Sequence, residues 1–484
     1  MTHDRLEHVD VLLVGAGLSG IGAACQLSRQ HPQRSYAILE RRHASGGTWD
    51  LFRYPGVRSD SDMFTLGYRF KPWRGEKALA DGPSILAYVR ETAREYGVDE
   101  HVRYGVHATS ASWDTDTARW TVTGTRDGEP FAMTCDFLWC TSGYYDYDRG
   151  FTPPFDGVDD FRGVVVHPQH WPEGLDYAGK QVLVIGSGAT AVTLVPALAG
   201  SGAGHVTMLQ RSPTYVLALP EVDRIARGLR RLLPERASYT LTRWKNVAVA
   251  TGLYQLSQRR PDLVRAMIRR ATVKALPEGY DVDTHFKPVY DPWDQRLCLV
   301  PDGDLFRSLS RGDASVVTAT IDRFTEQGVL LGSGEELEAD VVVTATGLNL
   351  VAFGGMDLVV DGRPVALPDT MAYKALMLSG VPNFAYTIGY TNASWTLKAD
   401  LVAEYVCRVL AHLDEHGQRV VVPVDDPAVE RRPFMDFMAG YVLRSLDQLP
   451  KQGDVEPWRL RQNYLYDVRS IRRAPIDDGV LAFS

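Results

Sequence analysis

The sequence predicts an α/β protein with two Rossmann-like, dinucleotide-binding domains and a helical insertion. Two observations carry the prediction of the domains. A strand, a glycine-rich turn, a helix and a second strand follow one another from residue 9, and the same order recurs from residue 182. Such a unit places its two strands side by side and parallel. A basic segment with apolar residues at helical spacing follows the second unit and predicts the insertion.

The first unit begins with an aliphatic run at residues 9–14, which ends in the turn GAGLSG at residues 15–20. Apolar residues at helical spacing follow the turn and predict a helix. A second aliphatic run, residues 36–39, ends at Glu40. The sequence therefore predicts a parallel pair of strands joined by a helix.

The second unit has the same order. The run at residues 182–185 leads into GSGATA at residues 186–191, and an apolar helix follows. The next predicted strand, residues 205–209, is followed by Gln210 and Arg211.

Two more apolar runs, at residues 137–143 and 341–347, each end in a glycine turn, as expected where a chain crosses between domains. We therefore expect a discontinuous first domain that encloses the second. The expected divisions are residues 1–145 for the first part of the first domain, 146–335 for the second domain with a helical insertion at about 221–290, and 336–484 for the return to the first domain and the C-terminal helices.

The insertion is strongly basic. Residues 221–275 contain 13 Lys and Arg against four acidic residues, with leucines and other apolar residues at helical spacing. Two interpretations stay open: a solvated face of packed helices, and attachment to an anionic membrane surface.

Composition is that of an ordinary globular protein, with 45% hydrophobic and 23% charged residues. The net charge of −8 argues against nucleic acid as the main partner. No secretory signal is visible, and no run reaches the roughly 18 apolar residues of a spanning helix. The five scattered cysteines suit a reducing compartment, so we expect a cytoplasmic protein.

Each glycine loop follows a strand and precedes a helix, and in this context such a loop indicates a dinucleotide-binding site. Gly15 makes the tight turn, Gly17 lets the backbone approach a pyrophosphate, and Gly20 allows close packing of helix and strand. The pyrophosphate is then held at the helix N-terminus. Ala191 replaces the third glycine in the second loop.

The residue that follows the second strand of each unit indicates which dinucleotide that unit binds. Glu40 and Arg211 each lie 25 positions after the first glycine of their loops. A carboxylate accepts the hydroxyls of an adenosine ribose and repels a 2′-phosphate, whereas a guanidinium binds that phosphate. The first site thus fits FAD and the second fits NADPH better than NADH, with Ser212 as a further donor.

Two longer patterns indicate oxygen chemistry. Residues 161–172, FRGVVVHPQHWP, match FxGxxxHxxxWP, and residues 46–60 match GGxW…[FY]PGxxxD. These are fingerprints of Baeyer–Villiger monooxygenases. Segments such as GSGATAVTLVPAL and GYTNASWTLKADL extend the resemblance over nearly the whole length. The chain resembles the class B flavoprotein monooxygenases of the Baeyer–Villiger type, and most of all the short, ethionamide-activating kind. A disulfide-reductase function is disfavoured because no closely spaced cysteine pair exists.

The resemblance implies that NADPH reduces the flavin, which reacts with O₂ to give a C4a-peroxyflavin that converts ketones to esters or lactones. Small sulfur-containing substrates, sulfides or thiocarbonyls, are implied as well. An arginine beside the flavin stabilises the negative charge in this family and an aspartate holds it. The matching residues are Arg296 and Asp60. A permanent cation suits a site where negative charge develops.

Further cofactor contacts are predicted on the same grounds. Together with the residues already named, the predicted cofactor-binding set is Gly15, Gly17, Ser19, Gly20, Glu40, Gly47, Thr48, Trp49, Arg58, Ser59, Asp60, Ala108, Gly186, Ser187, Gly188, Ala189, Thr190, Ala191, Arg211, Ser212, Thr346 and Gly347.

His167 could be read as an acid–base group, but it lies between the two nucleotide units. With Trp171 we assign it to a hinge that couples motion of the NADPH domain to catalysis. Trp49 is expected near the flavin, and Trp395 is a weaker candidate for the cavity wall. No spacing suggests a metal site.

One position departs from the family pattern, because larger members often carry Lys where this chain has Gln295. NADPH preference would then depend on Arg211 and Ser212. Two alternative functions stay open: an N- or S-oxygenating flavin monooxygenase with little ketone activity, which Trp171-Pro172 disfavours, and a non-catalytic nucleotide-sensing protein.

Overall fold

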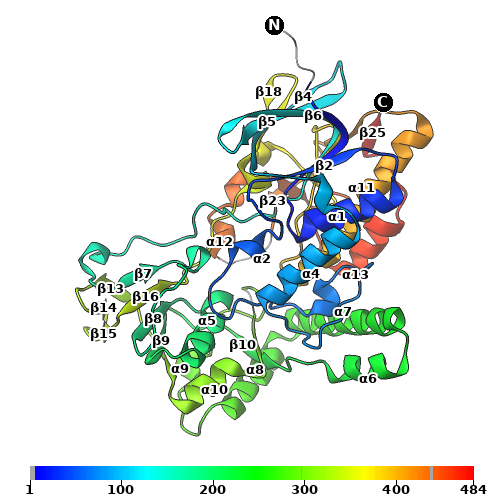
Figure 1. Cartoon of the computed structure of the whole chain (residues 1–484). Helices are drawn as coiled ribbons and strands as arrows, with labels where there is room; N and C mark the ends of the chain where they lie inside the picture. The colour runs from blue at the N-terminus through cyan, green and yellow to red at the C-terminus, as the bar shows by residue number, and fades with distance from the viewer. Residues whose placement is uncertain (1–5, 296, 436–439) are drawn as a thin grey trace.

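The computed structural model describes residues 6–295, 297–435 and 440–484, and it confirms the predicted α/β fold (Figure 1). The upper lobe in Figure 1 takes both ends of the chain, and the lower lobe takes its middle. We therefore propose that the first domain is discontinuous.

The first domain is built on a sheet with the order β18-β17-β4-β5-β6-β1-β2-β3, and β21 also pairs with β6. β1, β2, β3 and β6 run parallel, whereas β4, β5 and β6 form an antiparallel meander. The strands are β1 (His8–Val14), β2 (Tyr36–Glu40), β3 (Val102–Tyr104), β4 (Val106–Asp114), β5 (Arg119–Arg126), β6 (Glu129–Cys140), β17 (Asp357–Val360), β18 (Arg363–Pro364) and β21 (Phe384–Tyr386).

Helices cover one face of this sheet. Helix α1 is buried along most of its length because it lies against β1 and against α11. Alternate residues of β1 point to opposite faces, so Leu13 joins the core under α1 while Leu12 joins the core on the other face. The helices are α1 (Leu18–Gln30), α2 (Thr48–Leu51), α3 (Met63–Leu66), α4 (Gly82–Glu95), α11 (Trp395–His416), α12 (Gly440–Leu443) and α13 (Tyr464–Asp467). Short strand pairs complete this domain: β19 (Ala372–Tyr373), β20 (Met377–Leu378), β22 (Val421–Pro423), β23 (Arg431–Pro433), β24 (Lys451–Gly453) and β25 (Leu481–Phe483).

The second domain is an all-parallel sheet with the order β12-β9-β8-β16-β7. Its middle strands are continuous aliphatic runs because helices or loops cover both faces. The strands are β7 (Val164–Val166), β8 (Gln181–Ile185), β9 (His205–Gln210), β12 (Ala314–Thr318) and β16 (Val341–Thr344), with helices α5 (Ala189–Gly200) and α10 (Asp304–Arg311). Three antiparallel strands flank this sheet: β13 (Ile321–Phe324), β14 (Gly328–Leu331) and β15 (Glu336–Glu338).

Strand β16 extends this sheet beyond residue 335, the boundary expected from the sequence. It pairs with β8 on one side and β7 on the other, so it lies in the middle of the sheet. We therefore propose that the second domain ends near residue 345.

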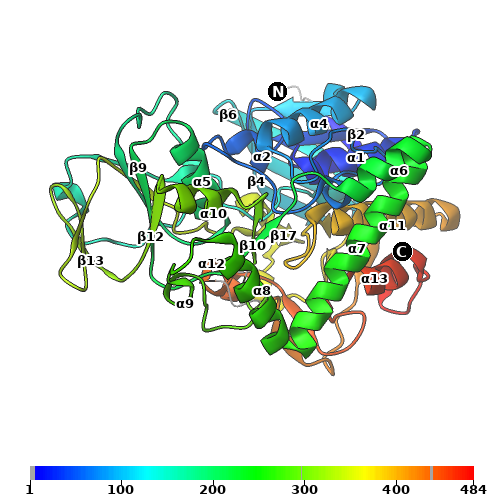
Figure 2. The same cartoon turned by 90° about the horizontal axis from the view of Figure 1, so that it is seen from below.

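The insertion is helical, and Figure 2 shows it lying across the lower face of the molecule. It consists of α6 (Arg224–Leu232), α7 (Glu235–Arg259), α8 (Pro261–Ala275) and α9 (Val282–His285), and it is bounded by the parallel pair β10 (Val216–Leu219) and β11 (Cys298–Pro301). Helix α7 also packs on the first domain. Buried Arg243 donates to the carbonyls of Phe64 (2.9 Å) and Gly67 (2.7 Å) and to Asp400 (2.9 Å).

The five cysteines are all buried and none forms a disulfide. In the described ranges, no helix combines the length and the apolar character needed to cross a bilayer.

Candidate functional site

A cavity of about 600 Å³ lies between the first glycine loop and helix α5. It is bounded by the carboxyl ends of β1 and β2, the edge where parallel sheets bind ligands. Ala189 and Thr190 reach it from the second domain. The predicted cofactor residues of the first domain that line it are Gly15, Gly17, Ser19, Glu40, Gly47, Thr48, Trp49, Arg58, Ser59, Asp60 and Ala108.

The first loop has the geometry that its glycines predicted. Gly15 has φ +105°, and a Cβ there would lie 2.8 Å from the Cα of Ser142. A Cβ at Gly20 would lie 1.9 Å from the carbonyl oxygen of Gly15, so helix and strand touch here. Gly17 precedes α1 with no side-chain cap, which leaves the first N–H groups of the helix available to a ligand.

Glu40 is held in place by the backbone. One carboxylate oxygen accepts the N–H of Ala16 (2.8 Å) and the other accepts the N–H of Arg42 (2.9 Å). The side chain is 5% exposed, and burial raises its pKa while these hydrogen bonds and the Arg42 charge oppose the shift. A carboxylate has about four acceptor positions, so two stay available to ribose hydroxyls.

The segment that follows α2 brings the second fingerprint to the cavity. Arg58 forms an ion pair with Asp304 at the start of α10, and so joins this segment to the second domain. Asp60 lines the cavity beside it. Arg296, the predicted catalytic residue, lies outside the described residues.

Trp395, the weaker candidate from the sequence, lines the cavity and is held there by two contacts. Its indole N–H donates to the Ser19 hydroxyl (2.7 Å), and its ring lies 5.0 Å from that of Tyr144. Tyr54, from the second fingerprint, also lines the cavity. Other aromatic residues of its wall, which sequence reasoning did not single out, are Phe52, Tyr144, Tyr145, Tyr147, Phe353 and Tyr390. They come from separate segments with no shared spacing, so no sequence signal joins them.

The second loop is built like the first. Gly186 has φ +133°, and a Cβ there would lie 2.3 Å from the carbonyl oxygen of Ala345. A Cβ at Gly188 would meet nothing within 4 Å, which leaves room for a phosphate above the helix N-terminus. Ala191, in place of the third glycine, is fully buried.

Arg211 and Ser212 follow β9 directly and are exposed. The Ser187 hydroxyl donates to the Ser212 carbonyl (3.3 Å) and contacts the Thr214 hydroxyl (2.7 Å). These contacts hold the second glycine loop beside the segment that carries Arg211.

His167 joins the two chain crossings between the domains. Its Nε2 lies 3.1 Å from the Gly347 carbonyl oxygen, which also accepts the Phe151 N–H (3.0 Å). Its Nδ1 accepts the Gln169 N–H (3.2 Å), so the neutral Nε2–H tautomer satisfies both contacts. Burial lowers the pKa of His167, against the opposing bond to Gly347. This geometry supports the hinge assignment over proton transfer.

Three predicted residues of this linker region lie apart from the main cavity. The Thr346 hydroxyl donates to the Phe151 carbonyl (2.6 Å), and Leu348, two residues on, lines the cavity. Trp171 packs on the core of the second domain, with its ring 6.5 Å from that of Tyr177. The cofactor contacts predicted for Thr346 and Gly347 stay predictions.

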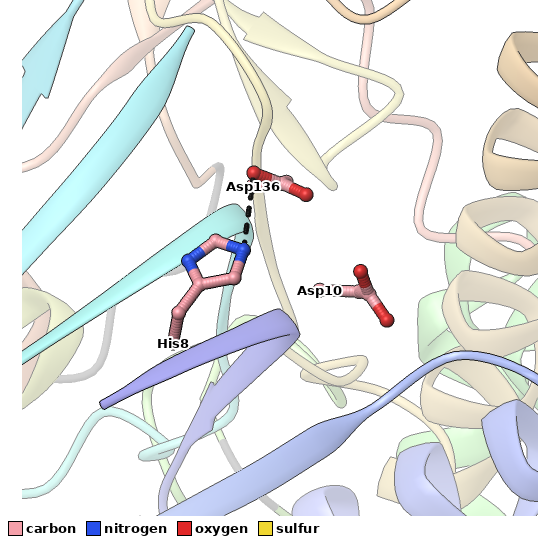
Figure 3. Close-up of side chains that lie close together, drawn as sticks. All are labelled: His8, Asp10 and Asp136. Atoms are coloured by element: carbon pink, nitrogen blue, oxygen red, sulfur yellow. Dashed lines mark ion pairs between the residues drawn. The ribbon is translucent and has the colours of Figure 1, made fainter. Parts of the chain in front are cut away.

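A cluster of His8, Asp10 and Asp136 lies outside the cavity, on strands β1 and β6 (Figure 3). His8 Nε2 lies 3.5 Å from Asp136 Oδ1, and Arg119 Nε lies 3.5 Å from the same oxygen. Asp10 accepts the N–H (2.6 Å) and hydroxyl (2.8 Å) of Ser35. Because a guanidinium already faces Asp136, the cluster reads as a structural polar contact between strands.

Comparisons with known proteins show relatives that match almost the whole chain. The flavin-binding monooxygenase-like family matches residues 79–251, and the NAD(P)-binding Rossmann-like domain matches residues 13–71. The FAD-containing monooxygenase EthA of Mycobacterium tuberculosis is 59% identical, over 99% of this chain and 98% of that protein. The probable FAD-binding monooxygenase AlmA of Acinetobacter baylyi is 48% identical, over 99% and 96%.

Solved structures show the same fold. An oxidised steroid monooxygenase bound to NADP has a TM-score of 0.73 at 24% identity, covering 86% of this chain and 88% of that one. An open structure of cyclohexanone monooxygenase has a TM-score of 0.73 at 19% identity, covering 86% and 90%.

Proposed function

Since this chain belongs to the family of EthA-like FAD-containing monooxygenases, we propose that it is a Baeyer–Villiger monooxygenase that converts ketones to esters or lactones and also oxygenates sulfides or thiocarbonyls. The chain is an FAD-dependent monooxygenase, and its cofactors are FAD and NADPH. Its co-substrate is O₂. The substrate class and the chemistry of the oxygen transfer are the proposed part.

The residues of the cavity fit FAD. The uncapped N-terminus of α1 offers N–H groups to a pyrophosphate, and Gly17 adds no side chain in front of them. Glu40 is buried and already fixed by two backbone bonds, which suits a carboxylate that must accept ribose hydroxyls without reorganising. FAD, when bound, supplies the activation of O₂, for which we propose the C4a-peroxyflavin that the resemblance implies.

The observation that carries the proposal is that one cavity has walls from both nucleotide units. Ala189 and Thr190, at the start of α5, face the same space as Gly17 and Asp60. A hydride donor held at α5 and an acceptor held at α1 would therefore meet inside one partly enclosed space. We propose that the aromatic side chains in its wall limit the access of water to a reactive oxygenating species.

The proposed reaction balances without any other reactant. One oxygen atom of O₂ is inserted between the carbonyl carbon and a neighbouring carbon of the ketone. The other oxygen leaves as water, with two electrons and a proton from NADPH and one proton from solvent. For a sulfide, the transferred oxygen adds to the sulfur lone pair.

We expect the FAD-loaded protein, given NADPH and ¹⁸O₂, to form esters that carry one labelled oxygen from phenylacetone or a cyclic ketone. Mass spectrometry measures the label, and hydrogen peroxide release measures uncoupled turnover. Sulfoxide formation from thioanisole with no ester from any ketone would favour the N- or S-oxygenating alternative. NADPH consumption that yields only hydrogen peroxide with every substrate would contradict the proposal.

The Arg211→Ala variant should lose its preference for NADPH over NADH. Removing charge-assisted bonds to the 2′-phosphate costs about 1.5–3 kcal/mol, so the ratio of the two kcat/KM values should fall about ten- to a hundredfold. The loss should appear in the NADPH value and leave the NADH value unchanged. Steady-state kinetics with both coenzymes measures it.

Arg323→Ala is the matched control, because it removes another exposed arginine of the same domain, on β13 of the three-stranded antiparallel unit. Its coenzyme preference should equal that of the wild type. An unchanged preference in Arg211→Ala would show that the second site is assigned wrongly.

A further inference from the structure

The helices α6, α7 and α8 expose apolar side chains that nothing in the described structure covers. The surface that they form together, here termed the insertion face, lies across the lower side of the molecule (Figure 2). Leu232 is 81% exposed, Val249 is 64% exposed and Met267 is 52% exposed. Ile225, Leu241 and Leu263 are also more than half exposed. Isolated exposed apolar residues are common, but six on three consecutive helices point to an interaction surface.

The same helices carry cations that make no side-chain ion pair or hydrogen bond within the described residues. Of the 13 Lys and Arg in residues 221–275, six make ion pairs or hydrogen bonds through their side chains, among them Arg243 and Arg269. The other seven have no such partner in the described part of the chain, and all seven are exposed. Three lie at α6 and the start of α7, namely Arg224, Arg231 and Arg236. Four lie at the end of α7 and on α8, namely Arg259, Arg260, Arg270 and Lys274.

Helix α8 shows that the two kinds of side chain share one surface. Val264 and Ile268 are buried and face the protein. Leu263, Met267, Arg270 and Lys274 are exposed at spacings of four, three and four residues, and so they lie along one stripe of the helix. Apolar side chains and cations on the same solvent-facing stripe are typical of helices that lie in a membrane interface.

Charge decides between the partners that such a surface could bind. A second copy of this chain would bring seven unpaired cations against seven others across a two-fold axis, and like charges repel. RNA would neutralise the cations but would leave the leucines and Met267 in water. An anionic bilayer neutralises the cations with its headgroups and also accepts the apolar side chains at the level of the acyl chains.

We propose that the insertion face docks the enzyme on an anionic lipid bilayer, with α6, α7 and α8 lying on its surface. The apolar side chains enter the interface and the unpaired arginines and lysine contact lipid phosphates. None of the residues that line the main cavity belongs to α6, α7 or α8, so the docked helices are not those that form the nucleotide sites.

The test is flotation of the FAD-loaded full chain with vesicles of phosphatidylcholine alone or mixed with phosphatidylglycerol. We expect flotation only with the phosphatidylglycerol vesicles, and weaker flotation as salt rises, because headgroup attraction is screened. The triple variant Arg231→Glu, Arg270→Glu, Lys274→Glu should lower the partition coefficient about a hundredfold or more. Leu263→Ser with Met267→Ser should lower it about tenfold and leave its salt dependence intact.

The matched control is Arg126→Glu, Arg323→Glu, Arg363→Glu, which changes the net charge equally at exposed positions on β5, β13 and β18. It should float like the wild type, and both triple variants should keep their FAD content and NADPH oxidation. Three results would overturn the proposal: no flotation with phosphatidylglycerol vesicles at low salt, equal flotation with both kinds of vesicle, or equal losses in the two triple variants. A dimer in sedimentation equilibrium that the first triple variant dissociates would assign the face to a second copy instead.

Discussion

Gly20→Ala should yield a folded protein that purifies almost free of flavin. A Cβ at this position would lie 1.9 Å from the carbonyl oxygen of Gly15 and 2.8 Å from the hydroxyl oxygen of Thr141. That hydroxyl, from the residue after β6, donates to the Gly15 carbonyl (2.9 Å), so both obstacles are held in place. The helix must move away from the turn, and the N–H groups that face the cavity move with it.

Overpacking of this kind costs about 1–3 kcal/mol, which corresponds to an FAD affinity about ten- to a hundredfold lower. The measurements are the ratio of flavin to protein absorbance after purification and the FAD concentration that restores NADPH oxidation. Circular dichroism checks that the variant has kept its fold.

Gly200→Ala serves as the matched control. It adds the same methyl group at the end of α5, where a Cβ would meet nothing within 4 Å. This variant should keep its flavin. Full flavin content in Gly20→Ala would mean that the helix can retreat without cost, and the role given to the third glycine would be wrong.

The parts of the fold that the sequence predicts are those encoded by short-range patterns. Apolar runs of four to six residues predicted β1, β8 and β9, and each glycine loop is followed by the helix expected after it. Glu40 and Arg211 were found because each follows a strand whose place is fixed by the preceding unit. Pattern and geometry agree here because the turn, the helix start and the strand end lie within one chain segment.

Contacts between distant segments could not be predicted in the same way. The Arg58–Asp304 ion pair joins residues 246 positions apart, and the Trp395 bond to Ser19 spans 376 positions. Neither has a local pattern, since the first depends on how the two domains meet and the second on how α11 packs beside α1. The later edge that we propose for the second domain has a related reason. β16 follows a three-stranded antiparallel unit, and only the pairing with β7 and β8 returns it to the parallel sheet.

The sequence motif marks His167, and its hydrogen bonds in the structure indicate what it does. The fingerprint marks the residue but does not say what it does. The bond to Gly347 and the bond from Gln169 use both ring nitrogens, so the imidazole has no free site for proton transfer in this arrangement. Its partners lie on the two crossings between the domains, which gives the hinge assignment a physical basis.

Arg296→Ala should abolish oxygen transfer to ketones while FAD binding stays normal. This prediction rests on the sequence match and on the position of Asp60 in the cavity wall. Transfer of oxygen to a carbonyl develops negative charge in a space with aromatic walls, where a permanent cation is worth far more than in water. Losing it should reduce ester formation about a thousandfold. NADPH oxidation should continue, with the electrons appearing as hydrogen peroxide.

The ratio of ester to NADPH consumed separates this loss of coupling from a loss of coenzyme binding. Arg296→Lys should recover part of the ratio, because it restores the charge but not the planar guanidinium that a carboxylate can hold. Arg53→Ala is the control, because Arg53 belongs to the same fingerprint segment as Asp60, residues 46–60, but does not line the cavity. Its side chain is 58% exposed and pairs with Asp50 and Glu173. Its removal should leave the ratio of ester to NADPH consumed unchanged. A wild-type ester yield in Arg296→Ala would contradict the role assigned to Arg296, and another residue would have to supply the cation. Among the described residues of the cavity wall, the cation nearest in sequence to Asp60 is Arg58. Its charge is already paired with Asp304.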